Sequence, residues 1–188
     1  MTVAAALTEA VIGFREWIVE DSVLLPPAAG VAWVPGVNTA RCYGHGACDS
    51  VPGSACDCGL YAMHAPPDEL EDYLIGPGAM VIGAIAAWGQ LQVHADGFRA
   101  EHARVVALAY PPQATPATIA RLAPAAARYE VELVAFEDLP AVASQHGTAV
   151  APSSRRGRRA RALGLPLPRT ARGSAFPAST RREPAQPT

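Results

Sequence analysis

The sequence has no lysine, few aromatic residues and no long hydrophobic run. Aromatic residues make up 6% of the chain, so the core should be small although 50% of the residues are hydrophobic. The most apolar stretch, GAMVIGAIAAWG at residues 78–89, is shorter than the ~20 residues that a membrane-spanning helix needs. No basic residue precedes Arg15, and Glu9 interrupts the apolar N-terminus, so the pattern of a secretory signal peptide is missing. We therefore expect a soluble, cytoplasmic protein.

Charge is unevenly distributed, because all fifteen basic residues are arginine and most of them lie near the C-terminus. Residues 1–150 have a net charge of −10, whereas residues 151–188 have a net charge of +8. The second segment is rich in arginine and proline and has no sustained periodicity, so we expect a disordered tail. Its arginine cluster could contact nucleic acid phosphates, fold back on the acidic body, or only keep the chain soluble. The candidate phosphate contacts are Arg155, Arg156, Arg158, Arg159 and Arg161.

The hydrophobic pattern predicts a single α+β domain over residues 13–150, preceded by an N-terminal arm at residues 1–12 that is loose or forms a short helix. The expected fold is a small twisted antiparallel β-sheet or partly closed barrel, with a metal-binding loop and a C-terminal helix-strand-helix extension. Pro124 could kink or divide the first helix of that extension. The expected strands lie at residues 14–20, 22–25, 30–36 and 130–136, and the expected helices at 66–75, 115–129 and 137–147.

A β-hairpin is predicted around Asp96-Gly97, because both residues accept the positive φ angles of a two-residue turn. With these two residues in the turn, His94 faces Arg99, Gln92 faces Glu101 and Val93 faces Ala100. One face of the hairpin is then polar, and it is either a solvated surface or a ligand surface in which His94 and Glu101 could act as acid and base. The candidate ligand surface consists of Gln92, His94, Arg99 and Glu101.

All four cysteines of the chain lie within residues 42–58. Five residues separate the first from the second, seven separate the second from the third, and one separates the third from the fourth. Zinc prefers about four thiolate or imidazole ligands in a tetrahedron, and clustered cysteines in a reducing compartment favour a metal over a disulfide. Gly59, directly after the last cysteine, can absorb the kink that a C-x-C pair needs around one ion. The predicted zinc ligands are Cys42, Cys48, Cys56 and Cys58.

Alternatives to this ligand set remain open. His45 or His64 could replace a thiol, and the cysteines could instead be free thiols packed under a loop or form a disulfide. Four protein ligands would leave no vacant position and would make the site structural, whereas catalytic zinc keeps one position for water.

The order of four motifs resembles that of a bacterial family of uncharacterised hypothetical proteins. These motifs are G-[FY]-R-x-W, W-x-P-G, C-x-C-G-[IL]-x-A and W-G-x-[VL]-x-x-H-x-x-G-[FY]-R-A-E, which this chain carries at residues 13–17, 33–36, 56–62 and 88–101. Members tend to have a histidine between the first cysteine and the C-x-C pair, whereas this chain has both His45 and Cys48 there. The resemblance implies no particular activity.

Together these features favour a zinc-stabilised binding or regulatory module, in which the cysteine loop and the hairpin present a surface for a small ligand or a protein partner. A metal-assisted hydrolase that uses His94 and Glu101 is the main alternative. A nucleic-acid-binding adaptor that uses the arginine-rich tail is a third hypothesis.

Overall fold

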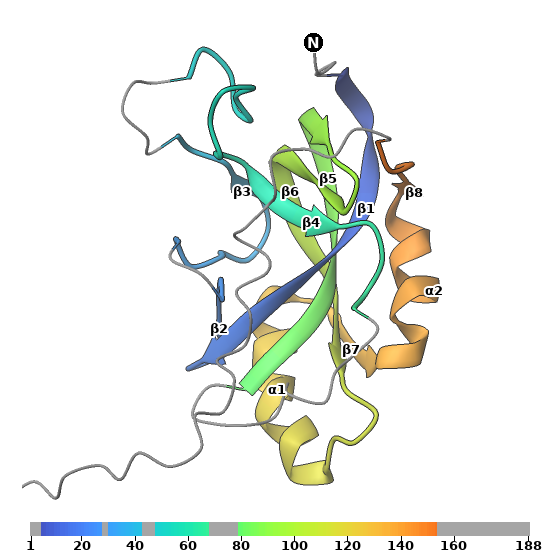
Figure 1. Cartoon of the computed structure of the whole chain (residues 1–188). Coiled ribbons are helices and arrows are strands. Elements are labelled where there is room, and N and C mark those ends of the chain that lie inside the picture. Colours follow the sequence, from blue (N-terminus) through green and yellow to red (C-terminus); the bar gives the residue numbers. More distant parts are fainter. Residues whose placement is uncertain (1–4, 28–29, 43–47, 68–78, 154–188) are drawn as a thin grey trace, which may run out of the picture.

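Strands dominate the fold of this chain, whose computed structural model describes residues 5–27, 30–42, 48–67 and 79–153 (Figure 1). The elements, in chain order, are β1 (Ala5–Glu20), β2 (Val23–Leu25), β3 (Asn38–Thr39), β4 (Leu60–Met63), β5 (Ala79–Val93), β6 (Gly97–Tyr110), α1 (Pro116–Tyr129), β7 (Glu132–Ala135), η1 (Phe136–Asp138), α2 (Leu139–Ala143), η2 (Ser144–His146) and β8 (Thr148–Ala149).

Three long antiparallel strands, β1, β5 and β6, form the centre of the sheet, with β5 between the other two. The short strand β4 pairs with β6 over its whole length and meets β1 at the single pair Phe14 and Met63. Strands β1, β5, β6 and β4 thus form a ring of hydrogen-bonded neighbours. Because a single residue pair closes this ring, it is not a true barrel. The predicted antiparallel sheet with partial closure is confirmed.

The interior of this ring is narrow where β1 and β4 meet. A Cβ atom on Gly13 would lie 2.6 Å from both the Cβ atom of Ala62 and the Cζ atom of Phe98. Such a separation is far below van der Waals contact, so only glycine fits at this position.

The C-terminal extension packs around the edges and faces of the sheet. Strand β7 pairs in parallel with β6, and β8 pairs in parallel with β1. Helix α1 begins after Thr115, whose side chain accepts a hydrogen bond from the backbone N–H of Thr118 at 3.2 Å. Pro124 does not divide α1 in two: it is exposed, and the carbonyl that loses its hydrogen bond can face water. The predicted helix-strand-helix order is confirmed.

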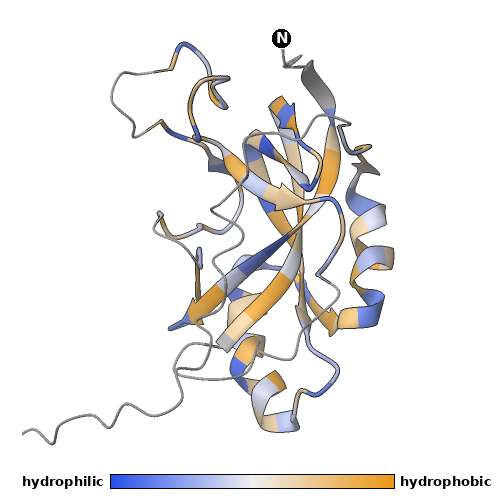
Figure 2. Ribbon diagram, in the orientation of Figure 1, coloured by the Kyte–Doolittle hydropathy of each residue, from blue (hydrophilic) through white to orange (hydrophobic). Residues whose placement is uncertain are grey.

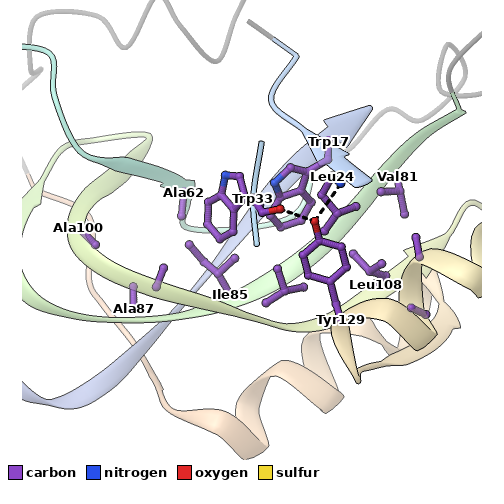
Figure 3. Close-up of a cluster of buried hydrophobic side chains, with 14 of the residues drawn as sticks. Trp17, Leu24, Trp33, Ala62, Val81, Ile85, Ala87, Ala100, Leu108 and Tyr129 are labelled. Atoms are coloured by element: carbon purple, nitrogen blue, oxygen red, sulfur yellow. Dashed lines mark hydrogen bonds between the residues drawn. The ribbon is translucent and has the colours of Figure 1, made fainter. Parts of the chain in front are cut away.

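The two helices cover opposite faces of the sheet, so the residues that the structure describes form two hydrophobic clusters. Val81 and Ile85 of β5 belong to the cluster that α1 completes, whereas the alternating residues Ile82 and Ala84 belong to the cluster that α2 completes. Figure 2 shows the hydrophobic stretches of the long strands, and Figure 3 shows the first cluster around Trp17, Trp33 and Tyr129.

Two expected elements differ from the observed ones. The first is the N-terminal arm, because residues 5–12 belong to strand β1 and most of them pair with β5. Their alanine-rich sequence predicts a helix or a loose chain. Their hydrogen-bond partners, however, lie in β5, more than 70 residues later in the chain. The second is the strand at residues 30–36, which is irregular and contacts β2 through Trp33 N–H, which donates to Leu24 O at 2.9 Å.

The hairpin turn is displaced from the predicted position by one residue. His94 N–H donates to Gly97 O at 2.8 Å, so Ala95 and Asp96 form the turn and Gly97 begins β6. Gly97 is needed in the strand, since a Cβ atom there would collide with the carbonyl oxygen of Ala62 in β4. Arg99 is consequently opposite Gln92, not His94. The pairing moves by two residues in total, an even number, so Gln92 and Arg99 still share a face.

Two further expectations fall outside the described residues: most of the helix at 66–75 and nearly all of the arginine-rich tail.

Candidate metal centre

The four cysteine sulfurs lie close together just before strand β4. All four Sγ atoms are within 4.8 Å of one another. The separations are 3.4 Å for Cys42 and Cys48, 3.6 Å for Cys42 and Cys56, and 3.8 Å for Cys48 and Cys58. A tetrahedron of thiolates at the usual zinc–sulfur distance has sulfurs about 3.8 Å apart, whereas a disulfide bond is about 2.05 Å long. The cysteines are not disulfide-bonded, and their spacing is that of a group that could hold one metal ion.

Glycine at two positions lets the chain wrap this closely. A Cβ atom on Gly53 would lie 2.7 Å from the Sγ atom of Cys48. Gly59 has φ +130°, and a Cβ atom there would lie 2.9 Å from the Cβ atom of Arg99. Both glycines therefore allow an approach that a side chain would block.

Backbone hydrogen bonds organise the loop around the last two cysteines. Cys56 N–H donates to Gly53 O at 3.3 Å, which closes a tight turn. The N–H of Gly53 donates to the Sγ atom of Cys58 at 3.2 Å. A hydrogen bond from the backbone to sulfur stabilises the thiolate form that binds metal.

Arg99 of β6 ties this loop to the sheet. Its side chain is 4% exposed, and its Nη1 atom donates to Cys56 O and, at 3.0 Å, to Cys58 O. Nη2 donates to Gly53 O at 3.4 Å. The guanidinium also lies 5.8 Å from the centre of the Tyr61 ring, and the hydroxyl of Tyr61 donates to Asp57 O. Two side chains of the sheet, Arg99 and Tyr61, thus hold the C-x-C segment through its backbone carbonyls.

Crowding changes the acidity of the thiols. The hydrogen bond with Cys42 raises the pKa of Cys48 to about 12, and burial raises the pKa of Cys58. These sulfurs hold their protons more firmly than an isolated thiol, so a metal ion has to displace those protons when it binds.

The two histidines named as substitute ligands have different outcomes. His64 is not part of the sulfur group; its Nε2 atom lies 2.9 Å from His94 O. His45 lies outside the described residues. Among the residues that the structure describes, the side chains that could hold a metal ion are therefore the four predicted cysteines.

The four residues of the candidate ligand surface do not form one site. Gln92 and Arg99 are opposite each other and both are buried, with Arg99 committed to the cysteine loop. Glu101 accepts a hydrogen bond from Gln90 N–H at 3.1 Å and lies 3.4 Å from Nε2 of His102. Gln90 lies in β5 four residues before His94, which follows the end of that strand, and an extended chain of that length spans about 13 Å. His94 and Glu101 are therefore not neighbours, and the acid and base of the hydrolase hypothesis do not meet.

His94 lies at the end of the hairpin and is only partly exposed. Burial lowers the pKa of His94, and the positive charges of Arg99 and His64 lower it further, while Asp96 opposes the shift. The imidazole is thus biased toward its neutral form.

The five arginines proposed as phosphate contacts lie outside the described residues. The sequence missed the part that Arg99 and Tyr61 play at the cysteine loop. No local signal could have shown it for Arg99, since Arg99 and Cys58 are 41 residues apart.

No model of a protein family matches this chain, and neither a curated protein nor a solved structure does. In the described part of the chain, every helix is too short or too polar to span a membrane.

Proposed function

We propose that the four cysteines bind one zinc ion, and that this closed structural centre holds the loop at residues 42–58 against the sheet of a binding or regulatory module. The observation that carries the proposal is the convergence of all four sulfurs within 4.8 Å, at separations close to those of a tetrahedral thiolate site. Thiolate ligands favour zinc over magnesium or calcium, which prefer oxygen.

A closed site supports a structural role in preference to a catalytic one. Four sulfur ligands complete the tetrahedron, so no position is left for a water molecule that the metal could activate. The separation of His94 from Glu101 also removes the acid and base pair that a hydrolase would need. The ordered loop then serves as a surface for a ligand or a protein partner. Membership of the bacterial family of hypothetical proteins remains a prediction.

A metal ion that fixes the cysteine loop would suit this sheet, because β4 closes the ring through one residue pair and begins two residues after the last cysteine. Zinc binding supplies on the order of 10 kcal/mol in zinc-finger peptides. Only part of that free energy is needed to order a loop that the sheet already anchors.

The test is elemental analysis of protein purified without a metal-affinity step, combined with thiol counting before and after chelation. We expect one zinc per chain, thiols that react slowly in the native protein, and four fast-reacting thiols after zinc is removed. Cys58→Ser should lose most of the bound zinc, and Ser54→Ala, an exposed change in the same loop, should keep it. Metal-free protein with four freely reacting thiols would overturn the proposal.

A further inference from the structure

Arg99 is a buried cation that contacts the backbone of the cysteine loop, and it has no carboxylate partner among the described residues. The side chain is 4% exposed, and no aspartate or glutamate oxygen of those residues lies within 4.0 Å of its guanidinium. Its hydrogen bonds go to the carbonyl oxygens of Gly53, Cys56 and Cys58. Burying a charge without a counter-charge costs free energy, so a negative charge near Arg99 would stabilise the folded chain.

The proposed centre supplies that charge. Four thiolates and one divalent ion carry a net charge of −2, whereas four thiols carry none. We infer that Arg99 is the counter-charge and the positioning residue of the metal centre, so that metal binding and the burial of Arg99 stabilise each other. This inference rests on the proposed zinc site.

The hydrogen-bond geometry explains why this residue is arginine. Two nitrogens of one planar group reach three carbonyl oxygens of the segment that carries the C-x-C pair. Lysine would keep the charge but, as a single ammonium on a flexible stem, could not hold three carbonyls in this arrangement. Arg99 also lies on β6, which pairs with β5 on one side and β4 on the other. The guanidinium therefore extends from a strand that is hydrogen-bonded at both edges.

Position and charge can be separated with three variants of the full chain. Arg99→Gln removes the charge and most of the donors, and Arg99→Lys removes the fork but keeps the charge. Arg104→Gln is the matched control, because Arg104 is an exposed arginine on the same strand and its loss changes the net charge equally. Zinc affinity is measured by competition with a chromophoric chelator, and coordination is followed by the visible spectrum of bound Co²⁺. Near-ultraviolet circular dichroism reports whether each variant is folded.

We expect Arg99→Gln to weaken zinc binding about 10–100-fold, the usual cost of removing a group that supports metal ligands. Arg99→Lys should recover part of that loss, and the Co²⁺ spectrum of both should differ from that of the wild type. Arg104→Gln should bind zinc within about twofold of the wild type, since an exposed charge in water contributes little.

Several outcomes would overturn the inference. Equal zinc affinity in the wild type and Arg99→Gln would do so. If Arg99→Gln is also less stable by the same amount in its metal-free and zinc-loaded forms, Arg99 only packs against the sheet. If Arg99→Gln does not fold, an Arg99→Lys affinity equal to that of the wild type overturns it. A wild-type chain that binds neither Zn²⁺ nor Co²⁺ refutes the proposed zinc site itself, and the inference with it.

Discussion

The hydroxyl group of Tyr129 joins helix α1 to the irregular segment after β2, and its removal tests how that segment is held. The hydroxyl donates to Trp33 O at 2.6 Å and accepts from Leu24 N–H at 3.1 Å (Figure 3). Tyr129 is 5% exposed, so water cannot easily replace either bond. Trp33 in turn packs against Trp17, with ring centres 5.2 Å apart, and lies under the guanidinium of Arg15.

Tyr129→Phe keeps the ring and its packing but leaves two buried backbone groups without this partner. Each such group costs about 1–3 kcal/mol, so for the two groups together we expect the free energy of unfolding to fall by about 2–6 kcal/mol. Urea unfolding followed by tryptophan fluorescence measures this as a lower midpoint with an unchanged slope. The matched control is Tyr110→Phe, since the half-buried Tyr110 has no hydrogen bond through its hydroxyl among the described residues. We expect that variant to change stability by less than about 0.5 kcal/mol. Equal stability of the two variants would refute the view that Tyr129 holds the segment through its hydroxyl.

Three further predictions concern the ring, the sulfur group and the hairpin. Gly13→Ala forces a Cβ atom to within 2.6 Å of Ala62 and Phe98, so thermal unfolding should show a loss of about 1–3 kcal/mol; an unchanged melting temperature would contradict the tight ring closure. Gly53→Ala places a Cβ atom 2.7 Å from the sulfur of Cys48, so chelator competition should show weaker zinc binding, and undiminished affinity would show that the loop has room to adjust. The pKa of His94 in the folded chain lies below its ordinary value of 6.5, so protonation favours the unfolded state and the contribution of His94 to stability falls as the pH drops through that value. An NMR titration should place the midpoint of His94 below 6.5, and a midpoint at or above it would contradict the effect of burial and Arg99.

The corrections to the predicted fold have a common cause. The N-terminal residues were expected to be loose or helical, and the turn was expected one residue later, because both expectations used only local sequence. Residues 5–12 find their partner in β5, and Gly97 is required by the nearby backbone of β4. Bulges in the β5–β6 pairing, including the one at Gly89 with φ +79°, shift the register in a way that alternation alone does not reveal.

The sequence by itself determined which sulfurs come together, because all four cysteines lie within seventeen residues and a chain that short keeps its thiols within reach of one another. It also determined the strand-rich fold and the order of the C-terminal elements, since hydrophobic alternation, Thr115 and the prolines act locally. Only the tertiary structure decided that β4 closes the ring on β1 and that Arg99 supports the cysteine loop from the neighbouring strand β6. Those relations depend on the register of strands far apart in the chain, which many side chains set together and no single stretch encodes.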